Sequence, residues 1–472
     1  MDIKVWRESD AAQPKFPADF KVAKKAVLQV TDLVTNRNKY YAIEIHDAKG
    51  KYRVFTHYGR TDDLETNPKA GCRESRYCDS SSQAESVYAD IYKEKTSKRK
   101  GYKEVDLASS KIGSHKSHGQ SSGTVDEKTL KKIADKTPPG KPKKSSLAPA
   151  VSKLVEFLYN EAVNSLTTTV NATITANGIE TPLGVLTLGQ IDKGASVLTQ
   201  LAAIIGTAKG KNIAKKWEDD IVRLSGEFYT VIPHRIGRSR DGLSEHWITT
   251  IDKIKEKEDT LQLMRDMLNV NGDTNVLLDP EIDKKYKALN CTIEAMDTNG
   301  KDFKSMKSYI EKSQVDTDTI KVKNLWRISR PVEASTFAAK VGNEKLLFHG
   351  SASRNWVGIL SRGLLLPKAV VKLGVKRTDA GWLGNGIYFG NAICTSYGYA
   401  GGNSMETCFI TVANVALGKI KKFSKITYGL DSPPIGYDSC HGVAGTGFSA
   451  DEFVVYNHNQ QKLVYLAECS GY

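Results

Sequence analysis

The hydrophobic period of this chain changes twice, and this change limits the possible folds more than any other feature. Residues 21–105 alternate apolar and polar side chains as strands do, for example in Lys39–Ile45 and Lys51–Gly59. Residues 147–315 repeat apolar positions every three or four residues, as helices do. Residues 320–472 return to short apolar strands separated by turns. Because no internal repeat is visible either, we expect a multidomain α+β protein.

The composition changes near residue 106. Residues 107–146 are rich in Ser, Gly, Lys and Pro and almost free of aromatic side chains. Such a segment buries too little apolar surface to offset its chain entropy, so we expect a flexible basic linker. The expected order is then a small antiparallel sheet with a helix at 1–106, the linker at 107–146, an all-α domain at 147–315, and a mixed α/β domain built on antiparallel sheets at 316–472.

The charge of the chain is unevenly distributed. The 472 residues carry a net charge of +14, and residues 91–150 alone hold 15 basic against 6 acidic side chains. This excess fits a polyanionic partner for the N-terminal part, and it fits a solvated tail that aids solubility equally well. The absence of a run of about 18 apolar residues predicts no membrane span, and the N-terminus lacks the pattern of a secretory signal. Seven scattered cysteines favour a reducing compartment.

Single residues of the C-terminal part give only weak signals by themselves. His349 ends an apolar strand, where a histidine is more often structural than a ligand contact. Gly384–Phe389 looks like a turn into a strand, since it lacks the third glycine of a dinucleotide-binding loop. Glu452 opens a very apolar strand, and a carboxylate at such a place is a modest sign of a site. Cys72 and Cys78 lack a second matching pair, so we expect no metal.

Five motifs of the C-terminal part together resemble the poly(ADP-ribose) polymerase family. They have the order and spacing of its ADP-ribosyltransferase fold, and they are Leu347–Ser351, Gly386–Phe389, Ser396–Tyr399, Ala416–Gly418 and Asp451–Tyr456. Upstream, Thr181–Gly184 and Phe228–His234 resemble the helical regulatory domain of that family, which would gate access to NAD. The N-terminal part resembles a WGR domain, with Tyr58-Gly59-Arg60 in place of Trp-Gly-Arg.

The resemblance implies an NAD-dependent ADP-ribosyltransferase that consumes NAD as a substrate and uses no metal. It implies a catalytic triad of His349, Tyr388 and Glu452. The residues implied for NAD binding are His349, Gly350, Ser351, Asn355, Tyr388, Ser396 and Tyr399. Gly350 and Ser396 would hold the nicotinamide carboxamide, and Tyr399 would stack on its ring opposite Tyr388. Glu452 would stabilise the positive charge that develops on the ribose as nicotinamide leaves.

The WGR-like part implies DNA as a partner, in particular strand-break ends, with Tyr58 and Arg60 as contact residues. Protein acceptors, including the chain itself, are the expected targets, and no membrane partner is expected. Basic clusters at 95–100 and 141–144 suggest a nuclear location. Thr395 stands where many polymer-forming members have Lys, which leaves polymer and single-unit transfer both open. Two alternatives remain: a mono-ADP-ribosyltransferase under protein rather than DNA control, and a catalytically weak nucleic-acid-binding scaffold.

Overall fold

The chain forms two compact units. The computed structural model describes residues 3–122, 145–170, 172–175, 178–207, 215–234, 236–239, 242–271, 281–315, 319–366, 381–401 and 407–471. The first unit contains the described residues up to 122 and the segment 166–268. The second contains residues 145–165 and the described residues from 281 onward. The expected multidomain α+β class is therefore confirmed.

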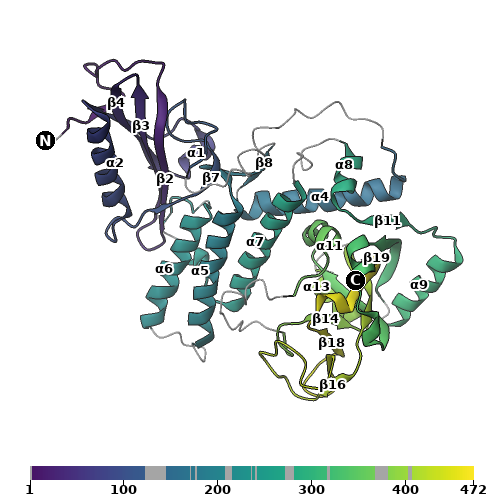
Figure 1. Ribbon diagram of the computed structural model, residues 1–472. Coiled ribbons are helices and arrows are strands. Elements are labelled where there is room, and N and C mark those ends of the chain that lie inside the picture. Colours follow the sequence, from purple (N-terminus) through teal and green to yellow (C-terminus); the bar gives the residue numbers. More distant parts are fainter. Residues whose placement is uncertain are drawn as a thin grey trace. The chain divides into compact units, whose positions relative to one another are not determined.

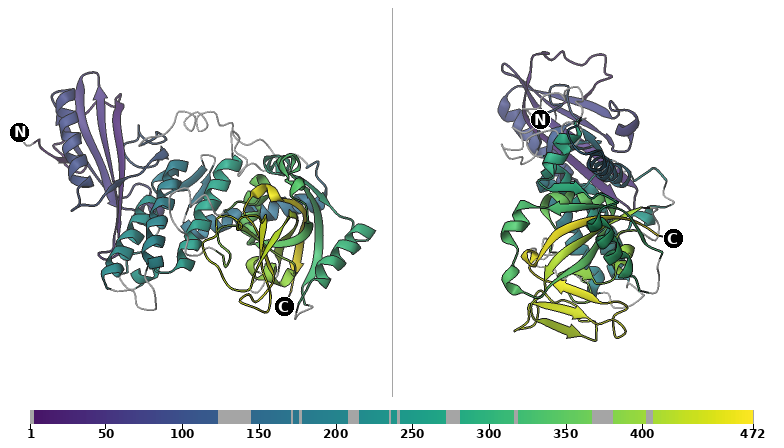
Figure 2. Two further views of the ribbon diagram at one scale, coloured as in Figure 1. Left: turned by 60° about the horizontal axis from the view of Figure 1, so that its bottom comes forward. Right: turned by 90° about the vertical axis from the view of Figure 1, so that its right-hand side faces the viewer.

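A six-stranded sheet forms the N-terminal module of the first unit, with the order β1–β5–β4–β3–β2–β6. The strands are β1 (Trp6–Arg7), β2 (Lys21–Asp32), β3 (Arg37–Ala48), β4 (Lys51–Arg60), β5 (Cys72–Cys78) and β6 (Lys103–Glu104), and the helices are α1 (Asp63–Thr66) and α2 (Ser81–Thr96). Helix α2 lies along one face of the sheet (Figures 1 and 2), where Ala84 and Tyr88 are buried with Leu28, Ile43 and Val54. This is the predicted antiparallel sheet with one helix.

The predicted linker at 107–146 is wrong for its first part. Leu107–Ser110 form strand β7, and Leu107 also bridges to Ser122. Residues 123–144, which include the Pro- and Lys-rich stretch of the prediction, lie outside the described residues. The segment 111–122, here called the strap, returns to the N-terminal module.

Buried polar groups of the sheet hold the strap. The Glu44 carboxylate accepts the backbone N–H of Ser114, with its two oxygens 3.0 and 3.2 Å from that nitrogen. Nδ1 of His57 accepts the N–H of Gly113 at 3.1 Å, and Nζ of Lys25 donates to a strap carbonyl at 3.1 Å. Composition could not reveal this because the strap is fixed by hydrogen bonds to distant residues and needs few apolar side chains of its own.

Helices make up most of the remaining first unit, as their period predicted. They are α5 (Leu188–Thr207), α6 (Lys215–Val231), η1 (Leu243–His246) and α7 (Ile251–Asn271), and α4 (Pro149–Val170) has its first part in the second unit and its last turn in the first. The all-α prediction missed a small sheet of order β7–β10–β9–β8, with β8 (Thr173–Thr175), β9 (Gly178–Thr181) and β10 (Gly184–Leu186). These strands are three or four residues long, which is too short for a clear alternating pattern.

Helix α6 packs against the end of strand β2 within the first unit. Gly226 makes this possible, because a Cβ there would lie only 2.7 Å from the carbonyl oxygen of Thr31. The backbone N–H of Thr31 donates to the Thr230 hydroxyl at 2.8 Å, and the Asn38 amide donates to the His234 carbonyl at 3.2 Å. The N-terminal module is therefore docked directly onto the helices.

A nine-stranded sheet forms the second unit, with the order β11–β12–β19–β15–β13–β14–β18–β17–β16. The strands are β11 (Thr292–Ala295), β12 (Lys321–Ser329), β13 (Glu344–Ser351), β14 (Ile387–Gly390), β15 (Cys408–Ala416), β16 (Ile420–Phe423), β17 (Ser439–Gly442), β18 (Glu452–Val455) and β19 (Gln461–Ser470). The helices are α8 (Ile282–Ala288), α9 (Lys301–Lys312), α10 (Pro331–Thr336), η2 (Ala339–Val341), η3 (Ser353–Asn355), α11 (Trp356–Arg362), α13 (Ile393–Tyr399) and η4 (His458–Gln460). Strands β16 and β17 are parallel, and the other pairs are antiparallel, which confirms the predicted mixed fold.

The predicted boundary between 315 and 316 lies too far along the chain. Strand β11 pairs with β12, and helix α9 buries Phe303 and Ile310 in the core of this second unit. Helix α9 follows the helical period seen over residues 147–315, but this period does not tell which unit buries its apolar face. The α+β unit therefore begins before β11.

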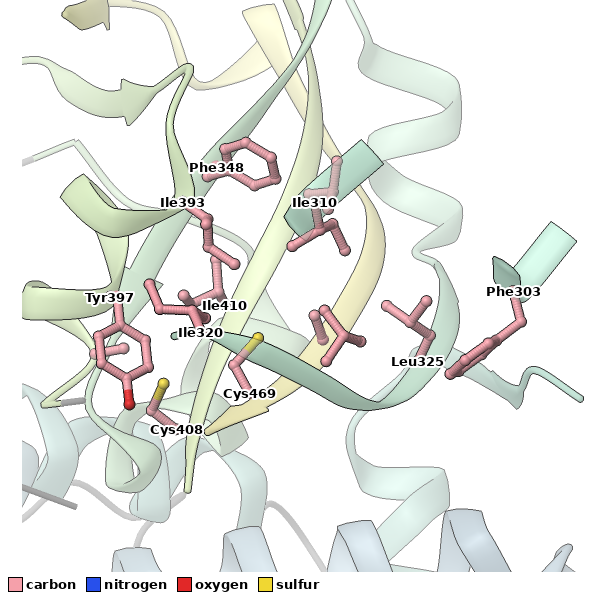
Figure 3. Close-up of a cluster of buried hydrophobic side chains, with 14 residues drawn as sticks. Phe303, Ile310, Ile320, Leu325, Phe348, Ile393, Tyr397, Cys408, Ile410 and Cys469 are labelled. Atoms are coloured by element: carbon pink, nitrogen blue, oxygen red, sulfur yellow. The ribbon is translucent and has the colours of Figure 1, made fainter. Parts of the chain in front are cut away.

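One apolar cluster supports the elements that carry the candidate site. Figure 3 shows Ile393 and Tyr397 of helix α13 near Phe348 of strand β13 and Ile410 of strand β15. Phe348, Ile393 and Ile410 are fully buried, and Tyr397 is 7% exposed. Burial of these side chains fixes helix α13 against the sheet, so the residues next to them have a defined position.

Candidate active site

Strand β13 carries the first predicted site residue, His349. Its Nδ1 lies 2.9 Å from the carbonyl oxygen of Tyr388. A carbonyl oxygen only accepts, so Nδ1 must carry the proton. Burial lowers the pKa of His349, which keeps the imidazole neutral. Its Nε2 is therefore left as an acceptor that could receive a hydrogen bond from a ligand hydroxyl.

Gly350 brings strand β13 unusually close to helix α13. A Cβ at this position would overlap the carbonyl oxygen of Ser396 and would lie 3.2 Å from the backbone nitrogen of Ala400. Only glycine allows this approach. Ser396 is 4% exposed and lies beside the Gly350 backbone, so the structure brings together the two residues predicted to hold one carboxamide.

The Tyr388 ring is held in one position by its own hydroxyl. That hydroxyl donates to the carbonyl of Gly384 at 2.8 Å and accepts the backbone N–H of Leu383 at 2.9 Å. Burial raises the pKa of Tyr388, so the group stays protonated. A Cβ at Gly381 would overlap the ring. The Tyr388 ring is thus fixed by its surroundings. Sequence reasoning missed Gly381, although the spacing of glycines before Tyr388 was a usable signal.

Glu452 stands at the start of strand β18 between two glycines. It pairs with Gly390 of β14 on one side and with Gly442 of β17 on the other. Burial raises the pKa of Glu452, and no hydrogen bond or ion pair to the described residues opposes this effect. Burial raises the pKa of Tyr388 and Tyr399, and the negative charge of Glu452 adds to this effect on both hydroxyls. Within the described ranges, the site therefore contains a half-buried carboxylate that has no partner.

The remaining predicted ligand contacts lie on helix α13, strand β13 and the turn η3. Tyr399 ends helix α13 and is 65% exposed, which leaves its ring available for stacking. The Ser351 hydroxyl accepts from the Asn355 amide at 3.0 Å, and the Trp356 indole donates to the Ser351 carbonyl at 3.1 Å. Ser351 and Asn355 thus lie together where β13 leads into helix α11.

Thr395 occupies a place next to the Glu452 row of the sheet. A Cβ at Gly390, the partner of Glu452, would lie 3.2 Å from the Thr395 Cβ. The Thr395 hydroxyl is buried and has no hydrogen-bond partner among the described residues. No cationic side chain from this position can therefore neutralise Glu452.

The predicted nucleic-acid contacts, Tyr58 and Arg60, both lie on strand β4. The Tyr58 hydroxyl donates to Glu74 at 2.8 Å. The Arg60 guanidinium donates to Asp62 at 2.8 Å, to the Asn36 backbone and side-chain oxygens at 2.9 Å each, and to the carbonyl of Gly237. Its side chain is 18% exposed. Arg60 therefore contacts the helical region of the first unit directly.

Metal binding and membrane insertion each require a recognisable group of residues. Among the described residues, no group of three or more His, Cys, Asp or Glu side chains is placed to hold a metal ion. Within the same ranges, no helix is both long enough and apolar enough to cross a membrane.

The assembled groups define what this site can do chemically. Two tyrosine rings can sandwich a planar group, and the paired Gly350 and Ser396 can hold an amide attached to it. The neutral His349 can accept from a sugar hydroxyl. The Glu452 carboxylate can stabilise a positive charge that forms close to it. The arrangement suits a ligand in which a planar leaving group departs from a sugar.

Three families of domain match consecutive parts of the chain. Residues 24–109 match the WGR domain, residues 145–286 match the poly(ADP-ribose) polymerase regulatory domain, and residues 300–449 match the poly(ADP-ribose) polymerase catalytic domain. The start of the last match at 300 agrees with the early boundary found in the fold.

Relatives match across these domains. The chain is 35% identical over 331 residues to the mouse protein mono-ADP-ribosyltransferase PARP4, which amounts to 68% of this chain and 16% of that protein. It is 28% identical over 448 residues to poly [ADP-ribose] polymerase 2 of Arabidopsis thaliana, covering 90% of this chain and 65% of that one. With poly [ADP-ribose] polymerase 1 of Caenorhabditis elegans it shares 26% over 461 residues, covering 92% and 44%. The chain thus spans less than two thirds of each of these relatives.

Proposed function

Since this chain belongs to the poly(ADP-ribose) polymerase family, with WGR, regulatory and catalytic domains, we propose that it transfers ADP-ribose from NAD to protein acceptors. The observation that carries the proposal is the half-buried Glu452 carboxylate, which has no partner among the described residues and whose charge acts on the hydroxyls of Tyr388 and Tyr399. A charge without a partner is costly to bury, so its retention here fits a group that meets its partner only during the reaction.

The residues fit NAD as a consumed substrate. Tyr399 and Tyr388 hold the nicotinamide ring, and Gly350 and Ser396 hold its carboxamide. His349 accepts a hydrogen bond from the adenosine-side ribose through Nε2. The bond between the ribose C1′ and the nicotinamide nitrogen breaks, and its electron pair leaves with nicotinamide. Glu452 stabilises the cationic ribose and accepts the proton of the attacking acceptor hydroxyl, whose oxygen forms the new bond to C1′.

Transfer of label from NAD to protein tests the proposal. Glu452→Gln keeps the shape of the side chain and removes its charge, so we expect transfer to decrease by about 100-fold or more while NAD binding changes little. A matched control is Glu468→Gln, since Glu468 lies on strand β19 of the same sheet and accepts from the exposed Asn324 amide at 2.7 Å. An unchanged transfer rate in Glu452→Gln would contradict the assignment.

The length of the product is a separate question. We propose that the enzyme can extend ADP-ribose into a polymer, and the alternative is single-unit transfer, because Thr395 stands where many polymer-forming members of the family have Lys. Relatives named as mono-ADP-ribosyltransferases and as poly [ADP-ribose] polymerases both match the chain. Gel sizing of labelled products separates the two, because polymer gives a ladder and single units give one band.

We further propose that the N-terminal module binds the ends of broken DNA, which then increases transfer and implies a nuclear location. The net charge of +14 and the basic excess near the module support this. Binding through phosphates predicts an affinity that decreases steeply as salt increases, with log K linear in log salt. Titration of a DNA end at several salt concentrations checks it. Binding that does not depend on salt, or the absence of DNA binding, would favour control by a protein partner. The nuclear location is tested separately, with a fluorescent fusion of the protein.

A further inference from the structure

Asp451, the residue before Glu452, is held by hydrogen bonds from three separate segments. One carboxylate oxygen, Oδ1, accepts from Nε2 of His441 at 2.7 Å and from the backbone N–H of Ala444 at 3.0 Å. The other oxygen, Oδ2, accepts from the amide of Asn391 at 3.1 Å. These three donors lower the pKa of Asp451 despite its partial burial, so the carboxylate stays ionised.

The three side chains come from three adjacent strands but do not share one register row, since His441 is paired with Phe453. Asn391 directly follows strand β14, Asp451 directly precedes strand β18, and His441 lies on strand β17. We call this group of three side chains the belt. It crosses the row formed by Gly390, Glu452 and Gly442, which are paired with one another by strand register. Each belt residue is thus the direct neighbour along the chain of one member of the row that contains Glu452.

The His441 ring is itself fixed. It stacks on the Phe453 ring with a centroid distance of 4.3 Å and an interplanar angle of 10°. Its side chain is 12% exposed and that of Asp451 is 28% exposed. The belt therefore has a packed anchor at one end, where solvent competes little for its hydrogen bonds.

Glu452 needs an external support of this kind. Its carboxylate has no hydrogen-bond partner among the described residues, and its strand neighbours are glycines without side chains. The position of the carboxylate is therefore set by the backbone at the start of strand β18. A group that stabilises a transition state loses much of its effect when it is displaced by about 1 Å.

We propose that Asp451 is a positioning residue for Glu452, and that it acts through the belt with Asn391 and His441. The inference rests on the proposed function of Glu452. The belt joins β14, β17 and β18 at the point where Glu452 enters the site. It leaves the Glu452 carboxylate itself free to meet the substrate.

The kinetic test uses the full chain. Asp451→Ala removes the acceptor of all three hydrogen bonds, and we expect kcat to decrease roughly 10- to 100-fold while KM for NAD changes less than about threefold. Asp451→Asn keeps an acceptor oxygen for His441 and Ala444, so it should restore most of kcat. If the alanine variant does not fold, Asn391→Ala tests the belt from its other end, with a smaller loss expected. A decrease confined to KM would overturn the proposal.

A double-mutant cycle separates positioning from general stability. If Asp451 acts through Glu452, then Asp451→Ala should cost almost nothing further when it is added to Glu452→Gln. Rate losses that simply add would show a structural role and overturn the inference. The matched control is Asp297→Ala, which removes a carboxylate that accepts the N–H of Asn299 at 3.0 Å near β11, at the opposite end of the sheet, and should leave kcat unchanged.

The two proposals fail in different ways. If Glu452→Gln transfers at the normal rate, the role of Glu452 is wrong and the belt inference is wrong with it. If Glu452→Gln is inactive and Asp451→Ala keeps its full kcat, only the belt inference is wrong.

Discussion

At the scale of single residues, the exposed ring of Tyr399 gives a direct test of the ligand side of the site. Tyr399→Ala removes a stacking surface, so we expect affinity for a nicotinamide analogue to decrease by about fivefold or more, since aromatic pairs contribute about 1 kcal/mol beyond simple burial. Tyr399→Phe keeps the ring and should bind nearly as well as the original protein. Calorimetric titration measures both. Equal affinity for the alanine variant would mean that Tyr399 is not a wall of the pocket.

The protonation of Glu452 gives a second prediction at this scale. Burial raises the pKa of Glu452 above its ordinary value of 4.5. Transfer needs the ionised form, so activity should decrease as the pH falls through this raised pKa, and the acidic limb should lie above the ordinary carboxyl range. His349 adds no limb near neutral pH because burial lowers its pKa. The dependence of kcat/KM on pH, with Glu452→Gln as the control that lacks the limb, measures this.

At the scale of elements, the strap is an ordered structure held by one buried carboxylate. Gly113 has φ +109, and a Cβ there would overlap the Glu44 side chain. We therefore expect Gly113→Ala to lower the free energy of unfolding of the N-terminal module by about 2–4 kcal/mol and to speed hydrogen exchange at the Ser114 amide. Gly119 is the matched control, because it has φ +81 and nothing lies within 4 Å of the place that a Cβ would take there.

The control separates backbone strain from the lost contact. Gly119→Ala should cost only about 1–2 kcal/mol, the penalty of a left-handed backbone for a residue with a side chain. Denaturant titration compares the free energies of unfolding of the two variants, and hydrogen exchange compares their Ser114 amides. Equal costs would show that the Glu44 contact does not hold the strap.

At the scale of the whole molecule, the proposed DNA signal from the N-terminal module can be tested at the contact of this module with helix α6. Gly226→Ala inserts a methyl group 2.7 Å from the Thr31 carbonyl and should push the two elements apart. DNA can increase transfer only if it prefers the active arrangement, so a loosened contact should reduce DNA stimulation by about fivefold or more. The rate of transfer in the absence of DNA should change little, and so should the affinity for DNA.

Helix stability cannot explain such a result. Alanine favours a helix by about 1 kcal/mol over glycine, so Gly226→Ala should not weaken helix α6 itself. Gly189→Ala in helix α5 is the matched control, since the nearest atom to a Cβ there would be the Thr187 hydroxyl oxygen at 3.8 Å. Rates with and without DNA ends are measured for both variants. Full stimulation in Gly226→Ala would show that the signal does not use this contact.

The sequence by itself determined the fold class of the chain and named the residues of the candidate site. Period-2 and period-3.6 patterns are local properties of strands and helices, so the N-terminal sheet was expected, and helices α5 (Leu188–Thr207) and α9 (Lys301–Lys312) both lie within the range 147–315 that shows the helical period. The family motifs named His349 and Glu452 because each motif is a short run of neighbouring residues. Patterns of this kind can be recognised in the sequence without knowledge of the fold.

Only the tertiary structure decided which distant residues meet. The strap is ordered because Glu44 accepts the Ser114 N–H across 70 residues of sequence, and strand β11 belongs to the second unit because it pairs with β12. The belt joins Asn391 to Asp451 across 60 residues. Hydrogen bonds between strands carry no periodic signal in either partner, since any residue with a suitable donor or acceptor satisfies them. Their existence follows from sheet register, which forms only when the whole unit folds.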